Sequence, residues 1–275
     1  MPVQARTETS ERTDGTAKEQ PVTAVAARAV RTSRVADHMV RVTLTHPSFA
    51  DPVRFPYHGP DHLIRLLLPG ATGELNLPRS SSGWWKEIQA MDEPDRPRVR
   101  NYTVRRIDRA RAEIDVDFVL HAENAGPASA WAADARPGDG IGVLSDRAGY
   151  APPADATDLL LVADETAQPA LAAIIETLPA HMRALAILEY RPGSAPELPA
   201  HPGVERVHLH PADGAEPGEA ALAHLEGRDL GPLDYAWLSG ESTLATSLRR
   251  HLVSGRGMDK ERVFFCGYWK RGVSH

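Results

Sequence analysis

The feature that most constrains the fold is a change in hydrophobic periodicity near the middle of the chain. Before residue 150, short segments alternate apolar and polar residues, as in AEIDVDFVL, where Ile114, Val116 and Phe118 share one face. A period of two predicts half-buried strands, and several such strands without long helices between them predict an antiparallel β-barrel. Residues 69–97, rich in Pro, Gly and Ser, are expected to form a long excursion between two barrel strands.

After residue 152, continuous apolar runs alternate with helical patterns. DLLLVAD, PALAAIIETL and ALAILEY have the features of a strand, a helix and a strand in turn. This alternation predicts a Rossmann-like parallel sheet covered by helices on both faces. We therefore predict a disordered tail over residues 1–20, a β-barrel domain over 21–150 and an α/β domain over 151–275.

Composition excludes several classes of protein. The chain carries 31 Lys and Arg against 37 Asp and Glu, and this net charge of −6 is poorly suited to nonspecific binding of nucleic acid. The single cysteine, Cys266, excludes an internal disulfide and a cysteine-based metal centre, and it fits a reducing compartment. The first twenty residues lack the apolar core of a signal peptide, and no segment approaches ~18 consecutive apolar residues. We expect a cytoplasmic protein with no nucleic-acid partner, no stable membrane insertion and no metal site.

The segment RNYTVR is the most informative stretch for chemistry. Its two strand faces carry Arg100 with Tyr102, and Asn101 with Thr103 and Arg105. An aromatic ring beside a hydroxyl can lie against a flavin, and flanking arginines can hold phosphate oxygens through two parallel hydrogen bonds. The alternative is an exposed strand in which Tyr and Thr reflect β-propensity alone.

A second candidate segment, GPASAW, follows the DFVLH strand and opens a predicted helix that ends near residue 135. The first turn of a helix presents unpaired N–H groups, so a diphosphate fits there, with Ser129 as a further donor and Ala128 small enough for close approach. An ordinary helix start with a serine near its cap is the alternative.

Two turns at the ends of predicted parallel strands form a third candidate. Asp164, Glu165 and Thr166 follow the first strand of the α/β half, and Gly240 with Glu241 ends a later one. Ligands of open α/β sheets bind at the carboxyl ends of strands, which favours a dinucleotide here. No G-x-G-x-x-G fingerprint is present at either turn, so routine strand-to-helix turns remain the alternative.

Taken together, these segments resemble one known family. RNYTVR, DFVLH, GPASAW followed by ARPGD, ADETAQPA and the terminal GYWKRG stand in the order and spacing of siderophore-interacting proteins, over about residues 22–272. These proteins are ferric-siderophore reductases within the ferredoxin–NADP reductase-like superfamily. The resemblance implies an FAD-binding barrel, an α/β domain that receives NADPH or NADH, and reduction of an Fe(III)–siderophore to Fe(II) with release of iron.

The resemblance also assigns roles by position and implies no catalytic acid or base. The residues that it places at FAD are Arg100, Asn101, Tyr102, Thr103, Arg105, Val119, His121, Ala128, Ser129, Thr166 and Trp269. Those that it places at NAD(P)H are Asp164, Glu165, Thr166, Gly240 and Glu241. The basic residues that it places at an anionic ferric siderophore are Arg65, Lys270 and Arg271.

Some positions depart from the family pattern, and some alternatives stay open. Ala130 stands where a basic residue is common, and Ala163 stands where glycine is usual. The electron acceptor is open between a siderophore and a protein carrier, which leaves a ferredoxin- or flavodoxin-linked flavin reductase as one alternative and a non-catalytic siderophore-binding protein as another. The donor is open between NADPH and NADH, with Arg191, Arg249 and Arg250 as candidate contacts to a 2′-phosphate.

Overall fold

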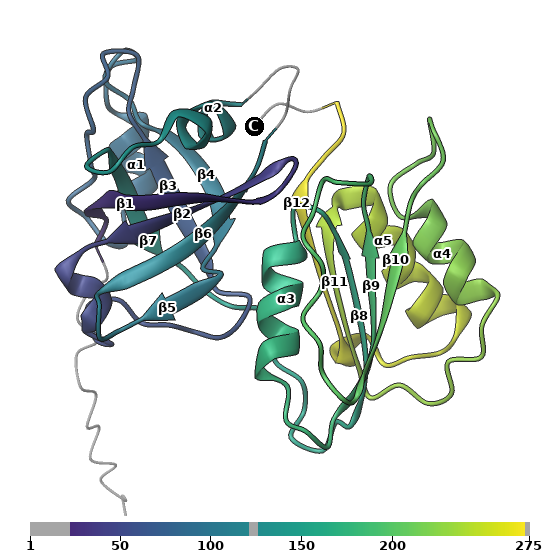
Figure 1. Ribbon diagram of the computed structural model, residues 1–275. Coiled ribbons are helices and arrows are strands. Elements are labelled where there is room, and N and C mark those ends of the chain that lie inside the picture. The colour runs from purple at the N-terminus through teal and green to yellow at the C-terminus, as the bar shows by residue number, and fades with distance from the viewer. Residues whose placement is uncertain (1–22, 121–125, 273–275) are drawn as a thin grey trace, which may run out of the picture.

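A computed structural model describes residues 23–120 and 126–272, which form two sheets (Figure 1). The first is a seven-stranded antiparallel sheet from the N-terminal half, and the second is a five-stranded parallel sheet with helices from the C-terminal half. The predicted fold class is therefore confirmed. The predicted tail over residues 1–20 lies outside the described residues.

The N-terminal sheet has the strand order β4-β3-β7-β1-β2-β6-β5. Its strands are β1 (Val25–Ala36), β2 (Met39–Thr45), β3 (Leu63–Leu68), β4 (Arg98–Thr103), β5 (Arg106–Asp108), β6 (Glu113–Val119) and β7 (Gly140–Ser145). A 3₁₀ turn, η1 (Pro47–Ala50), follows β2, and helix α2 (Pro127–Asp134) follows β6. The excursion between β3 and β4 carries the short helix α1 (Trp84–Gln89).

One segment of chain forms both ends of this sheet. β4 is the first strand in the order and β5 the last, yet only Val104 and Arg105 separate them in the sequence. The Val104 N–H donates to the carbonyl of His62, and the Arg105 N–H donates to the carbonyl of Asp115, 2.8 Å away. Residues 98–108 therefore continue from pairing with β3 to pairing with β6, and the sheet curls into a barrel-like domain around an apolar interior that includes Val42 and Val116.

The C-terminal sheet has the order β10-β9-β8-β11-β12, with every pairing parallel. Its strands are β8 (Asp158–Asp164), β9 (Arg183–Glu189), β10 (Val204–Leu209), β11 (Tyr235–Glu241) and β12 (Val263–Trp269). Its helices are α3 (Gln168–Thr177), α4 (Glu219–Glu226) and α5 (Ser242–Arg250), the last extended by a π turn (His251–Gly255). No helix in the described part of the chain is long and apolar enough to cross a bilayer.

Burial on both faces explains the unbroken apolar run of β8. Leu159 and Leu161 pack with α3, whereas Leu160 and Val162 pack with α4 and α5 on the opposite face of the sheet (Figure 1). The order of strand connection reverses between β8 and β11, and parallel strands present their carboxyl ends at one edge, so this switch point is the expected ligand edge of the sheet.

A buried carboxylate joins the two domains. Asp61, which precedes β3, accepts hydrogen bonds from the N–H groups of Gly149 and Tyr150 at 3.0 and 2.8 Å, and from the indole Nε1 of Trp237 at 3.0 Å. Gly149 and Tyr150 belong to the connecting segment, and Trp237 lies in β11. The connection is tightly packed, because a Cβ built on Gly149 would lie 2.0 Å from the Phe264 ring.

Two further contacts cross the junction. The β1–β2 hairpin reaches the α/β domain, where fully buried Met39 packs among residues of β8 and α3. Arg105 forms two hydrogen bonds of 2.7 Å to the carboxylate of Glu176 on α3. The Arg105 side chain is 7% exposed and that of Glu176 is 36% exposed. These contacts and those of Asp61 fix the orientation of the two sheets.

We expect Asp61→Ala to lower the free energy of unfolding by roughly 3 kcal/mol, because it leaves donors at a packed junction without their acceptor. Urea denaturation followed by tryptophan fluorescence measures this loss. Asp213→Ala, which removes an exposed carboxylate, is the matched control and should change stability little. Equal effects in the two variants would contradict the role of Asp61.

The Glu176 ion pair should make stability depend on pH. Hydrogen bonding to Arg105 lowers the pKa of Glu176 below its usual value. Its contribution is therefore present above the unfolded-state pKa of about 4.3 and is lost as the pH falls through the lower folded-state pKa. We expect Glu176→Gln to cost about 1 kcal/mol at pH 7 and almost nothing near pH 3, a modest figure because Glu176 is partly exposed. A cost that does not change between these pH values, or an equal cost for the exposed Glu226→Gln, would contradict this account.

Candidate functional site

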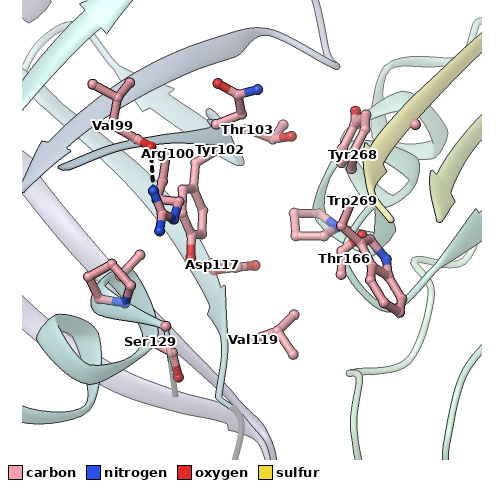
Figure 2. Close-up of a pocket in the computed structure, with 16 residues that line it drawn as sticks. Val99, Arg100, Tyr102, Thr103, Asp117, Val119, Ser129, Thr166, Tyr268 and Trp269 are labelled. Atoms are coloured by element: carbon pink, nitrogen blue, oxygen red, sulfur yellow. Dashed lines mark hydrogen bonds between the residues drawn. The ribbon is translucent and has the colours of Figure 1, made fainter. Parts of the chain in front are cut away.

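A cavity of about 680 Å³ lies between the two domains (Figure 2). β4 and β6 supply one wall, the first turn of α2 supplies the adjoining corner, and the ends of β8 and β12 supply the opposite wall. The lining residues used below are Val99, Arg100, Asn101, Tyr102, Thr103, Asp117, Val119, Ala128, Ser129, Thr166, Pro169, Tyr268 and Trp269.

Tyr102 and Thr103 form the barrel side of this cavity. The Tyr102 ring packs against Phe118, with centroids 4.5 Å apart and ring planes inclined by 39°, which fixes the ring while it lines the cavity. Burial raises the pKa of Tyr102, so its hydroxyl stays neutral at physiological pH. Thr103 is 6% exposed and presents a hydroxyl at the same wall. A flat aromatic ligand would meet a rigid ring and a hydroxyl here.

Arg100 and the start of α2 give this part of the cavity its positive character. The Arg100 guanidinium donates to the carbonyl of Val99 at 2.8 Å, and Figure 2 shows it on the same side of the cavity as Ser129. Burial lowers the pKa of Arg100 from a value so high that the side chain remains charged. Residues 126–129 bring the N-terminus of α2 to the cavity. A guanidinium beside a helix N-terminus suits a phosphate or diphosphate.

Asp164 organises the opposite wall. Its buried carboxylate accepts hydrogen bonds from Thr166 Oγ1 at 2.6 Å, from the Glu241 N–H at 2.7 Å and from Trp269 Nε1 at 2.8 Å. Burial raises the pKa of Asp164, and the hydrogen bonds from Thr166 and Trp269 act in the opposite direction. Asp164 thus holds in place the two predicted side chains, Thr166 and Trp269, that face the barrel across the cavity.

Gly240 and Glu241 lie behind this wall. Gly240 has a φ of +140°, and a Cβ there would lie 2.5 Å from Cγ of Asp164, so only glycine allows the carboxylate its position. Glu241 caps α5 and accepts from the N–H of Arg271 at 3.0 Å. Although burial acts to raise it, hydrogen bonds from the backbone of Arg271 and Thr243 hold the pKa of Glu241 below its usual value. Gly240 and Glu241 thus support the position of Asp164 and the end of β12.

A second cavity of about 460 Å³ adjoins the first and shares Thr166 and Trp269 with it. The other lining residues are Asp164, Glu165, Glu189, Tyr190, Arg191, Pro211, Ala215, Glu216, Pro217 and Arg271. It lies at the carboxyl ends of β8, β9 and β10. Three predicted nucleotide contacts, Asp164, Glu165 and Thr166, therefore meet at one site.

The predicted basic residues do not form a single group. Arg65 on β3 is held by Asp146, with Nε to Oδ2 at 2.8 Å, and also donates to Asn101 at the first cavity. Lys270 is exposed directly after β12. Arg271 lines the second cavity and pairs with Glu216 at 3.3 Å. Arg65 and Arg271 thus belong to the surroundings of different cavities.

One predicted flavin contact, Arg105, lies away from both cavities. Arg105 is not among the lining residues of either cavity, and its guanidinium pairs with Glu176 across the domain junction. His121 lies outside the described residues.

Asp117, Pro169 and Tyr268 line the first cavity and were not predicted. Asp117 lies on the polar face of β6 beside Arg41, with Arg41 Nε to Asp117 Oδ1 at 2.7 Å, so the alternation of that strand already placed it opposite Phe118. Tyr268 lies inside the terminal motif GYWKRG, and burial raises its pKa. Tyr268 directly precedes Trp269 at the end of β12, so its position in the same terminal motif is the signal that could have found it.

A barrel-like antiparallel domain joined to a parallel sheet of this strand order, with a cavity between them at the strand ends, is the ferredoxin–NADP reductase-like fold. Residues 28–149 match the model of the siderophore-interacting FAD-binding domain, and residues 156–272 match that of the siderophore-interacting protein. An uncharacterized protein of Mycobacterium tuberculosis is 33% identical over 263 residues, which cover 88% of this chain and 89% of the relative. The chain therefore belongs to the siderophore-interacting protein family.

Two further relatives are informative. The crystal structure of a siderophore utilization protein from T. fusca superposes with a TM-score of 0.76 at 33% identity, covering 94% of this chain and 96% of that one. The ferric vibriobactin reductase ViuB of Vibrio cholerae is 28% identical over 250 residues, which cover 88% of each chain.

The residues of the first cavity fit FAD. The wall of Tyr102 and Thr103 offers an aromatic face and a hydroxyl to a flavin, while Arg100 and the start of α2 offer donors to a diphosphate. The volume of about 680 Å³ lies within the range of organic cofactor sites. The FAD-binding domain thus holds a donor set that matches both parts of the cofactor.

We expect Arg100→Ala to weaken FAD binding by about tenfold to a hundredfold, because it removes a charge-assisted hydrogen bond to phosphate. Quenching of flavin fluorescence in a titration of the flavin-free protein measures the change. Arg98→Ala is the matched control, because Arg98 lies on the same strand and is exposed, yet does not line the cavity. Equal loss of affinity in both variants would reject a specific role for Arg100.

Proposed function

We propose that this protein is an FAD-dependent reductase that passes electrons from a nicotinamide dinucleotide to an iron(III)–siderophore complex in the cytoplasm. The observation that carries the proposal is a cavity of about 680 Å³ between the domains and a second of about 460 Å³ that shares Thr166 and Trp269 with it. The relation to ViuB, a ferric vibriobactin reductase, supports the choice of acceptor.

The chemistry that FAD supplies when bound is the conversion of a two-electron hydride donor into single-electron delivery. The chain's own part is orientation. Tyr102, which packs against Phe118, and Thr103 would hold the ring system from the barrel side. Thr166 and Trp269, both hydrogen-bonded to Asp164, would contact the nicotinamide from the other side. Such positioning of two reactants at contact distance accounts for a large share of catalysis when no proton transfer is needed.

The substrate is expected near two basic side chains around the first cavity, the part-buried Arg65 and the exposed Lys270. Arg65 contacts Asn101 at the cavity rim, and Lys270 follows the strand end that carries Trp269. These charges would raise the local concentration of an anionic ferric siderophore despite the net negative charge of the chain. Reduction favours release of iron, because the hard oxygen donors of a siderophore hold Fe(II) much less tightly than Fe(III).

The test is anaerobic reduction of ferric siderophores by the FAD-loaded protein with NADH and NADPH, with Fe(II) trapped by a chromogenic chelator. We expect Fe(II) to form at the expense of the dinucleotide. We expect Lys270→Gln to lower kcat/KM for an anionic ferric catecholate by roughly threefold to tenfold, and for a neutral ferric hydroxamate much less. Lys260→Gln is the matched control, because Lys260 is exposed at the opposite end of β12, roughly 20 Å away along a seven-residue strand.

Three outcomes would reject the proposal. Siderophore binding without dinucleotide oxidation would indicate a binding protein. Much faster reduction of a ferredoxin or flavodoxin than of any ferric siderophore would indicate a protein-linked reductase. A preparation that takes up no FAD would remove the basis of the mechanism.

A further inference from the structure

We propose that the electron donor is NADH and that the carboxylates of the second cavity select it against NADPH. This inference rests on the proposed function, since it names the donor that the reductase uses. The two dinucleotides differ only at the adenosine ribose, where NADH carries a 2′-hydroxyl and NADPH a 2′-phosphate. Discrimination therefore depends on the groups that surround the ribose.

Glu189 lies at the strand end where dinucleotide-binding folds distinguish the ribose 2′-hydroxyl of NADH from the 2′-phosphate of NADPH. It is the last residue of β9, the second strand of the sheet in chain order, and it lines the second cavity. In dinucleotide-binding folds, an acidic residue about 20 positions after the first phosphate-binding turn accepts a hydrogen bond from the ribose 2′-hydroxyl, whereas an arginine nearby accommodates a 2′-phosphate. The chain has a glutamate at this position.

The Glu189 carboxylate is held in a fixed place. It accepts from the N–H of Gly218 at 2.7 Å and from the N–H of Ala221 at 3.0 Å, at the start of α4. The residue is 5% exposed, so the carboxylate cannot turn away into solvent when a ligand enters. A carboxylate oxygen retains further lone pairs for a ribose hydroxyl, but it repels a phosphate.

The two arginines of the cavity already face carboxylates. Arg191 lies 3.4 Å from Glu165, which also accepts from Ser194 Oγ at 2.7 Å and has a side chain only 14% exposed. Arg271 lies 3.3 Å from Glu216 and donates to the carbonyl of Ala215. Each of these two guanidinium groups is therefore already paired with a carboxylate, and neither is free of a partner to bind a phosphate.

The sum of these charges is negative. Among the described residues that line the cavity, Glu165, Glu189 and Glu216 stand against Arg191 and Arg271, even when the buried Asp164 is left out. A phosphate monoester would add about 1.5 to 2 further negative charges. The remaining wall includes Tyr190 and two prolines, which suit the flat adenine ring of either dinucleotide and do not discriminate.

Calorimetric titration of the FAD-loaded protein with NAD⁺ and with NADP⁺ tests the inference without turnover. We expect NAD⁺ to bind about tenfold or more tightly than NADP⁺ at low ionic strength, with a parallel ratio of kcat/KM for NADH over NADPH. Equal or tighter binding of NADP⁺, or no measurable binding of either nucleotide at millimolar concentration, would overturn the inference.

Charge-removing variants assign the effect to residues. We expect Glu165→Gln and Glu216→Gln each to narrow the ratio of NAD⁺ to NADP⁺ affinity by roughly threefold. Glu197→Gln is the matched control, because Glu197 is exposed in the same domain and does not line the cavity. A ratio that the control changes as much as the two variants do would show that net charge, and not this cavity, discriminates.

Failure of the inference and failure of the proposed function give different results. A protein that reduces ferric siderophore with NADPH at least as well as with NADH would retain the function and lose the inference. A protein that binds NAD⁺ preferentially but reduces no ferric siderophore with either donor would lose the function, and the inference about its electron donor with it.

Discussion

The hydrogen bonds that Asp61 accepts from three donor groups fix the geometry on which the rest of the structure depends. This carboxylate of the barrel-like domain accepts hydrogen bonds from Gly149 and Tyr150 of the connecting segment and from Trp237 of the parallel sheet. The first cavity has one wall in each domain, so a small rotation at this junction would change the distance between Tyr102 and Trp269. The proposed transfer between a nicotinamide and a flavin would need that distance to stay constant, and a buried carboxylate with three donors restricts such a rotation.

The sequence was informative wherever one strand face or one turn carried the signal. Alternation in β6 predicted its apolar face, and the continuous run of β8 predicted a strand covered by helices on both faces. Adjacency within a motif likewise brought Tyr102 and Thr103 to one cavity.

Ion pairs between residues far apart in the sequence could not be predicted from its periodicity or motifs. Nothing in RNYTVR shows that Arg105 pairs with Glu176, which lies 71 positions further along the chain. The sequence therefore predicted a phosphate contact for Arg105 and gave no sign of the ion pair. The same holds for Arg271, whose side chain turns to Glu216 in the second cavity.

The connection between β4 and β5, which closes the barrel-like sheet, is too short to accept an added residue without changing the strand register. Val104 and Arg105 alone connect the strand that carries Tyr102 and Thr103 to the strand that pairs with β6. One added residue there would exchange the faces of every residue that follows in the strand and would turn the paired side chains away from their partners. The excursion between β3 and β4 is not constrained by strand pairing in this way. Insertions and deletions among related proteins should therefore occur in that loop and be absent from residues 98–108.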